Sequence, residues 1–172
     1  MHSDTGHLEI VEAVARSGQP TPALECLCAL FRQAVGFDLF TVTLMKQPTH
    51  AGGSIVSGYR MYSTIPDAFP AVVEVPFGSK EWTHAMVVEK QNLVMDTVED
   101  YRRYYEGWAS LKKAGYRSAA NLPVVFNGAA LGTINLTSKT EAYFTAERVN
   151  AARQIQALSA LVMLACAQSH RR

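Results

Sequence analysis

Residues 121–136 read Asn-Leu-Pro-Val-Val-Phe-Asn-Gly-Ala-Ala-Leu-Gly-Thr-Ile-Asn-Leu. Two largely apolar runs in this stretch flank Asn127 and Gly128, and an Asn-Gly pair suits the two positive φ angles of a type I′ turn. Two strand-like runs joined by such a pair are typical of an antiparallel β-hairpin. We therefore predict a hairpin with its turn at Asn127-Gly128.

The register of this hairpin predicts which side chains share a face. In a regular two-residue hairpin, Asn135 lies opposite Ala120 and Thr133 lies opposite Leu122. Asn121 points to the other face in this register unless a bulge intervenes. One face is then predicted to carry neutral donors and acceptors, which favour binding over acid–base catalysis: Ser118, Thr133, Asn135 and Thr137.

Helix and strand patterns extend outward from the hairpin on both sides. Residues 38–45 and 54–64 are rich in β-branched and aromatic residues and predict a second hairpin, with its turn at 50–53. Helices are predicted at the two ends, over 7–17, from Thr21 as N-cap to Gly36, and over 145–168. Between the hairpins the sequence predicts four segments: an extended connection over 65–80, a helix over 81–90, a strand over 92–96 and a helix over 98–114.

Size and charge limit the class of protein. The chain has 172 residues, 48% of them hydrophobic, so it can bury the core of one domain, and we expect a single domain over residues 1–172. The 16 lysines and arginines nearly balance 15 acidic residues, and the net charge of +1 gives no field that would attract nucleic acid or a membrane surface. Neither is expected as a partner.

The chain also lacks membrane and secretion signals. Its apolar stretch over residues 157–167 is shorter than the roughly 20 residues that span a bilayer. Residues 1–9 lack the basic start and apolar run of a secretory signal. A cytoplasmic location is expected.

The metal-binding residue types are scattered. His50, His84 and His170 stand alone in the sequence, and no ligand spacing connects them, so neither a metal site nor a cofactor is expected. The three cysteines lie in segments predicted to be helical, where a free thiol behaves as a small hydrophobic group: Cys26, Cys28 and Cys166.

Three stretches resemble one family. Residues 121–136 resemble the signature hairpin of GAF domains, and residues 34–42, Ala-Val-Gly-Phe-Asp-Leu-Phe-Thr-Val, resemble the first strand of that family. Residues 60–70, Arg-Met-Tyr-Ser-Thr-Ile-Pro-Asp-Ala-Phe-Pro, resemble a pattern seen in small, stand-alone, bacterial-type GAF proteins.

The resemblance implies an α/β (α+β) fold with a GAF/PAS-like central antiparallel sheet of five or six strands. The N- and C-terminal helices would cover one face, and a ligand pocket would lie on the other. The domain core would cover about residues 20–168, after a short helix over about 7–17. The first and last helices often form a dimer bundle in the family, so a homodimer is expected. Covalent tetrapyrrole attachment and methionine sulfoxide reduction are disfavoured, because residues 77–137 contain no cysteine.

Several side chains are candidates for the pocket, each with an ordinary structural alternative. Arg60 and Tyr62 are two apart on a predicted strand and would share a face suited to a carboxylate, or Arg60 is simply solvated. His84 is a candidate general base or an exposed helix histidine, and Asp96 is a candidate carboxylate or a helix N-cap. Four aromatic residues would wall a cavity that stacks on a flat ring, or belong to the core: Trp82, Tyr104, Tyr105 and Trp108.

Three functions remain open at this point. The first is a ligand-binding module whose pocket uses a set of ten residues: Arg60, Tyr62, Trp82, His84, Asp96, Tyr104, Trp108, Ser118, Thr133 and Asn135. The second is a small enzyme acting on the same kind of metabolite through Tyr62, His84, Asp96 and Ser118. The third is a dimerisation or partner-docking module that uses the first and last helices.

Overall fold

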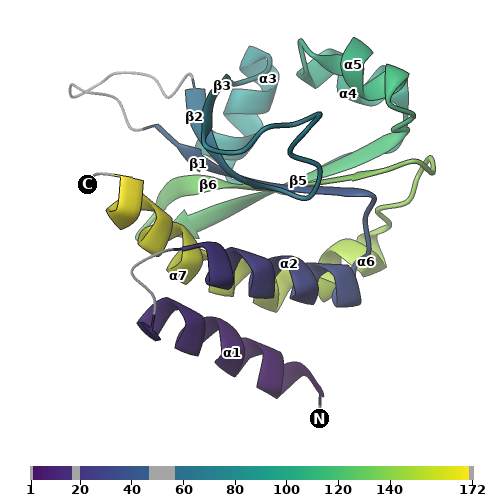
Figure 1. Cartoon of the computed structure of the whole chain (residues 1–172). Helices are drawn as coiled ribbons and strands as arrows, with labels where there is room; N and C mark the ends of the chain where they lie inside the picture. Colours follow the sequence, from purple (N-terminus) through teal and green to yellow (C-terminus); the bar gives the residue numbers. More distant parts are fainter. Residues whose placement is uncertain (1, 17–19, 47–56, 171–172) are drawn as a thin grey trace.

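The computed structural model describes residues 2–16, 20–46 and 57–170, and these form a six-stranded sheet with helices on both faces (Figure 1). All neighbouring strands are antiparallel, in the order β3-β2-β1-β6-β5-β4. This confirms the expected α+β class. The strand bounds are β1 Leu39–Met45, β2 Ser57–Ser63, β3 Val73–Pro76, β4 Leu93–Met95, β5 Ser118–Phe126 and β6 Ala129–Ser138.

Two groups of helices cover opposite faces of this sheet (Figure 1). Under the sheet in that view lie α1 His2–Arg16, α2 Thr21–Ala34, α6 Ala146–Ala151 and α7 Arg153–His170. The other face carries α3 Lys80–Thr83, the π-helix η1 His84–Glu89, α4 Val98–Tyr104 and α5 Trp108–Lys113. The first and last helices therefore share one face, as predicted, while the dimer they were expected to form stays a prediction.

The face towards α2 and α7, here called the helix face, holds the main hydrophobic core. Alternate strand residues point there, and Phe40, Leu122 and Ile134 are fully buried in it. Phe31 of α2 packs against Phe40, with ring centroids 5.6 Å apart. Regular alternation along each strand then sends the intervening residues to the opposite face, here called the cavity face.

The turn of the predicted hairpin is confirmed, but its register is not. Asn127 and Gly128 have φ angles of 48° and 74°, as a type I′ turn requires. The register shifts between Val124 and Val125, because Leu131 has no partner in β5. Because of this one-residue bulge, the partner of Asn135 is Asn121 and not Ala120. Asn121 therefore lies on the cavity face, and the predicted pairing was wrong.

A second bulge changes the face of another candidate. Val42 pairs with Tyr62 and Thr43 pairs with Arg60, so Met61 is the extra residue in β2. Arg60 consequently points to the cavity face, while Tyr62 points to the helix face and packs against Phe40. The prediction that Arg60 and Tyr62 share a face was wrong, because a bulge breaks the period of two on which it rested.

Five local predictions also differ from the structure. The connection over 65–80 contains the short edge strand β3, which tolerates Pro76 at its end. The helix predicted over 98–114 is interrupted, because Tyr105 is extended, and the closing helix is divided into α6 and α7. Pro20, not Thr21, is the N-cap of α2, and Thr97, not Asp96, caps α4. The predicted turn at 50–53 and the predicted strand residues 54–56 lie outside the described residues.

None of the helices in the described ranges is both long and apolar enough to cross a lipid bilayer.

Candidate ligand-binding site

A cavity of about 210 Å³ lies between the cavity face of the sheet and the helices above it. Strands β1, β2 and β6 supply its polar floor: Thr41, Thr43, Arg60, Thr133, Asn135 and Thr137, with Leu39. The segments above the sheet supply mostly apolar residues, which include Phe69, Phe77, Trp82, Tyr105 and Leu111. An apolar roof over a few converging polar groups is the usual composition of a small-molecule site.

Sheet pairing arranges the polar floor in three cross-strand rows. Thr43 pairs with Arg60 on one side and with Thr133 on the other. In the next row Asn135 lies between Thr41 and Asn121. In the third row Thr137 pairs with Leu39. Because these rows are two residues apart along each strand, their side chains all project from the same face.

A hydrogen-bonded network crosses the floor and reaches the roof. The indole Nε1–H of Trp82 donates to Asn121 Oδ1 at 2.8 Å, and the Tyr105 hydroxyl donates to the same oxygen. Asn121 Nδ2 donates to Asn135 Oδ1, also at 2.8 Å. Asn135 Nδ2 in turn lies 3.2 Å from the hydroxyl oxygens of Thr41 and Thr43, to which it donates. The network fixes the side chains of both asparagines in the sheet.

Two segments of the roof are joined by a close backbone contact. The Ser79 N–H donates to the Tyr104 carbonyl at 2.9 Å, which joins the segment before α3 to the end of α4. A Cβ atom at Gly78 would clash with that carbonyl oxygen, so this approach requires glycine. Tyr105 follows directly in an extended conformation and directs its hydroxyl to Asn121. The break between α4 and α5 therefore forms part of the site.

Arg60 is the charged group of the floor. One of its terminal nitrogens donates to the Pro70 carbonyl at 3.0 Å, and its guanidinium carbon lies 6.0 Å from the ring centre of Phe69. Desolvation by burial lowers the pKa of Arg60. No carboxylate in the described part of the chain lies within ion-pair distance of it. A partly buried guanidinium therefore faces the cavity with most of its donors free.

Thr137 has an unusual environment. Its side chain is 6% exposed, and its hydroxyl has no hydrogen-bond partner among the described residues. A buried hydroxyl without a partner is costly, so each such case in a native protein calls for an explanation. Here the residue lines the cavity, and a bound molecule can supply the missing partner.

The structure brings four of the ten predicted pocket residues to the cavity: Arg60, Trp82, Thr133 and Asn135. His84 instead lies on the outer side of the roof, with Nε2 3.5 Å from Glu89 Oε1, and its side chain is 61% exposed. Tyr104 lines the same outer groove as His84. Trp108 packs outside the cavity between Arg102 and Lys112.

The other three predicted residues are further away. Tyr62 lies on the helix face, where burial raises its pKa to about 12, and it neighbours the Cys28 thiol. The hydroxyl of Ser118 donates to the Thr140 carbonyl at 2.7 Å, and the bulge at Leu131 in β6 places Ser118 on the helix face. Asp96 is exposed, and its backbone carbonyl accepts from Ala142. Tyr62, His84, Asp96 and Ser118 therefore do not meet in one place.

Sequence reasoning missed the central residue of the network. Asn121 is fully buried and joins the roof to the floor, yet a regular hairpin register sends it to the other face. Thr41 and Thr43 were read only as strand-forming residues. The available signal was Gly132, since an isolated glycine in a strand is typical of a bulge, and a bulge there places Asn121 opposite Asn135.

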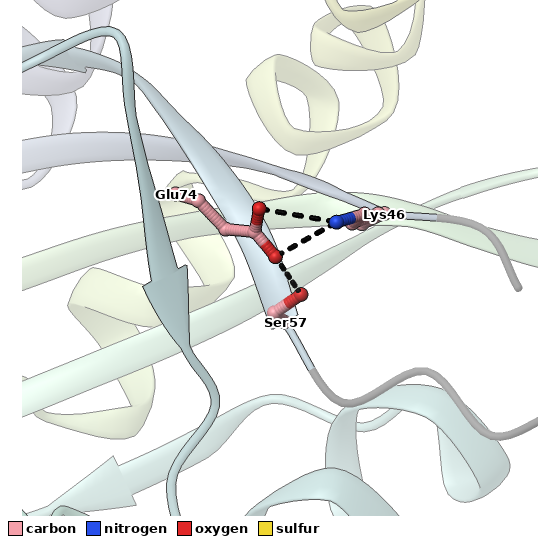
Figure 2. Close-up of polar contacts among 3 residues, drawn as sticks. All are labelled: Lys46, Ser57 and Glu74. Carbon is pink, nitrogen blue, oxygen red and sulfur yellow. Dashed lines mark hydrogen bonds and ion pairs between the residues drawn. The ribbon is translucent and has the colours of Figure 1, made fainter.

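A second polar cluster lies away from the cavity, across one end of β1, β2 and β3 (Figure 2). Lys46 Nζ contacts both carboxylate oxygens of Glu74 at 3.0 and 3.1 Å, and the Ser57 hydroxyl donates to Glu74 at 2.7 Å. The hydrogen bond from Ser57, followed by that from Lys46, lowers the pKa of Glu74. The Lys46 and Glu74 side chains are 45% and 44% exposed, so this ion pair contributes little stability.

Two larger hollows are surface features. One, of about 680 Å³, runs beside Pro123 and Gln156, and the other, of about 480 Å³, lies beside His84. Most side chains that line the first are solvent-exposed. Among the described residues, no group of three or more metal-binding side chains converges at either hollow or elsewhere. The smaller cavity over the sheet is therefore the candidate site.

A six-stranded antiparallel sheet with the terminal helices on one face and a roofed polar cavity on the other defines an α+β domain with an internal pocket. The family model for the GAF domain matches residues 23–163. The chain therefore belongs to the GAF domain family, which is known for small-molecule binding in sensors. The comparison with curated proteins finds no match.

Solved structures share this fold at low sequence identity. The GAF domain of an Acinetobacter phosphoenolpyruvate-protein phosphotransferase is 14% identical with a TM-score of 0.68, and the match covers 96% of each chain. The GAF domain of a Bacillus halodurans sensor histidine kinase is 9% identical with a TM-score of 0.70, covering 91% of this chain and 100% of that one. A type II free methionine-R-sulfoxide reductase from Thermoplasma acidophilum is 14% identical with a TM-score of 0.61, covering 84% and 91%. These similarities show the fold alone.

Proposed function

We propose that this domain binds one small metabolite, aromatic or carboxylated, in the cavity between the sheet and the 80–115 segment. The observation that carries the proposal is the Thr137 hydroxyl, which is buried, lines the cavity and has no hydrogen-bond partner in the described part of the chain. The cavity of about 210 Å³ is smaller than the roughly 300–1,000 Å³ of pockets for drug-sized ligands. This size suits a small metabolite better than a nucleotide or a tetrapyrrole.

The chemistry of the cavity supports binding over catalysis. Among the residues that line it, Arg60 and Tyr105 are the two with titratable side chains. Burial raises the pKa of the Tyr105 phenol, which therefore keeps its proton at neutral pH, and arginine stays charged there. A general acid or base works best with a pKa near the operating pH. The four candidate residues of the enzyme hypothesis, Tyr62, His84, Asp96 and Ser118, lie apart from one another and outside the cavity, which gives no support to catalysis.

Native mass spectrometry of the purified protein, followed by thermal denaturation with a metabolite panel, tests this proposal. A co-purified small molecule, or a panel member that raises the melting temperature, is expected, because a ligand at 100 times its Kd stabilises the folded state by about 2.7 kcal/mol. A protein that is empty and insensitive to the whole panel would contradict the proposal.

A matched pair of variants locates the binding. Leu111→Trp places a large side chain into the cavity from α5 and should abolish the stabilisation by the ligand. Ser110→Trp adds the same side chain at an exposed position of the same helix and should leave it intact. Equal ligand responses in the two variants would place the ligand elsewhere.

A further inference from the structure

The hydrogen-bond network described above has a direction, and its direction is set by Trp82. An indole N–H can donate but cannot accept, so the atom of Asn121 that faces it must be the carbonyl oxygen. The Tyr105 hydroxyl reaches the same oxygen. The side-chain amide of Asn121 therefore has one possible orientation, with its NH₂ group towards Asn135.

This orientation is passed along the floor of the cavity. Asn135 must present its oxygen to the NH₂ group of Asn121, so its own NH₂ group faces Thr41 and Thr43. Both threonine hydroxyls therefore act as acceptors towards Asn135. Each hydroxyl still has its proton to donate, and neither proton has an acceptor among the described residues. Since both residues line the cavity, these donors are available to a bound molecule.

The remaining polar groups of the floor have the same character. The Thr137 hydroxyl lacks a partner among the described residues, and Arg60 uses one terminal nitrogen for the Pro70 carbonyl while its other donors stay free. Asn121 Oδ1 accepts two hydrogen bonds within the network, and Asn135 Oδ1 accepts one. The floor therefore combines one positive charge with several hydroxyl donors.

From these donors we infer that the cavity selects a small carboxylic acid, bound as its carboxylate against Arg60, with the hydroxyls of Thr41, Thr43 and Thr137 as further donors along the floor. The inference rests on the proposed function and names the ligand class for the same site. A carboxylate has acceptor oxygens and no donor, and it matches a guanidinium geometrically. Phe77 and Trp82, whose ring centroids lie 4.9 Å apart, give the roof an aromatic surface for the apolar part of the acid.

The test compares carboxylates with amides of the same shape. A panel of small aromatic and aliphatic carboxylates, beginning with benzoate, is titrated into the protein by calorimetry, each beside its primary amide, beginning with benzamide. At least one carboxylate should bind, and at least about tenfold more tightly than its amide, because hydrogen bonds to charged groups are the stronger ones. Equal or tighter binding of the amides would overturn the inference and leave the proposed function standing. Binding only of uncharged metabolites from the wider panel would also overturn the inference and leave the proposed function standing. No binding of any metabolite would contradict both the inference and the proposed function.

Thr137→Val gives a signature that a purely structural residue would not show. Valine has nearly the same shape but lacks the hydroxyl, so the free protein should melt at the same temperature or higher, because an unpaired buried polar group is removed. The bound acid loses a donor of the floor, and its affinity should fall about tenfold. A lower melting temperature with unchanged carboxylate affinity would overturn the assignment.

Arg60→Met and Arg153→Met form a matched pair for the charge. Arg60→Met should weaken carboxylate binding by more than tenfold, since it removes the charged hydrogen bonds of the site. Arg153 is exposed on α7, outside the cavity, and its replacement should remove the same charge without effect on binding. An equal loss of carboxylate affinity in both variants would show that net charge alone matters, and it would overturn the role of Arg60.

Discussion

The two faces of the sheet are made by alternate residues of the same strands, but their surroundings differ. Phe40 and Val42 of β1 point to the helix face, where α2 and α7 bury them among other apolar side chains. Thr41 and Thr43, their direct neighbours, point to the cavity face and accept hydrogen bonds from Asn135. Each of these strands therefore contributes alternate residues to the hydrophobic core and to the cavity. The helix face buries the largest apolar cluster of the protein, and the cavity face carries the Thr137 hydroxyl, which has no partner among the described residues.

The largest effect should come from the helix face. Phe40→Ala removes a fully buried ring that contacts Phe31, Phe37 and Tyr62, and it should lower the free energy of unfolding by about 3–5 kcal/mol. Urea denaturation measures this loss. The protein that remains folded should bind carboxylates with little change, because the ring lies on the other side of the sheet. A cost below about 1 kcal/mol would contradict the assignment of the core to this face.

A smaller loss of stability, together with loss of the link between roof and floor, is expected from Asn121→Leu. The leucine leaves the indole N–H of Trp82 and the Tyr105 hydroxyl without their acceptor, and the free energy of unfolding should fall by about 1–3 kcal/mol, chiefly through the buried indole. Thermal denaturation and ligand titration should both be affected, unlike in Phe40→Ala. Asn150→Leu, at an exposed position of α6, serves as the control. An unchanged ligand affinity in Asn121→Leu would contradict the prediction that the hydrogen-bond network contributes to ligand binding.

The smallest effect concerns pH. Burial, and after it the neighbouring Cys28, raises the pKa of Tyr62 from 10.0 to about 12. In the unfolded chain the phenol ionises first, so between these values the unfolded state binds fewer protons and stability falls as pH rises. Tyr62→Phe should make this alkaline loss shallower, as followed by urea denaturation from pH 8 to 12. Ligand affinity at neutral pH should not change, because Tyr62 lies on the helix face. An identical pH profile in the variant would contradict the burial of the phenol.

The fold was largely predictable from sequence because its signals are local. The Asn127-Gly128 turn needs positive φ angles that few residue pairs accept, and the buried face of each strand repeats every two residues. The family resemblance at residues 121–136 then supplied the arrangement of sheet and helices, which the match over residues 23–163 confirms.

The site was predictable only in part because two bulges decide it. The unpaired Leu131 in β6 turns Asn121 towards the cavity and Ser118 away from it. The extra Met61 in β2 separates Arg60 from Tyr62 in the same way. A bulge shifts the phase of every residue beyond it. Gly132, directly after Leu131, is typical of a bulge or of a close backbone approach, whereas no such residue adjoins Met61. The break between α4 and α5 has a local signal in Gly107, the N-cap of α5, but the contact from Tyr105 to Asn121, sixteen residues away, has none.

The position of Trp82 has a practical consequence. The chain contains two tryptophans, and Trp108 lies outside the cavity. Trp108→Phe would leave a protein whose long-wavelength ultraviolet emission comes from the indole that lines the cavity. Trp82 is 4% exposed, and its indole donates its N–H to Asn121. A molecule that binds beside the indole should change the polarity of its surroundings and the access of collisional quenchers to its fluorescence. The fold therefore contains an intrinsic optical probe, with which occupancy can be followed in solution without any added dye.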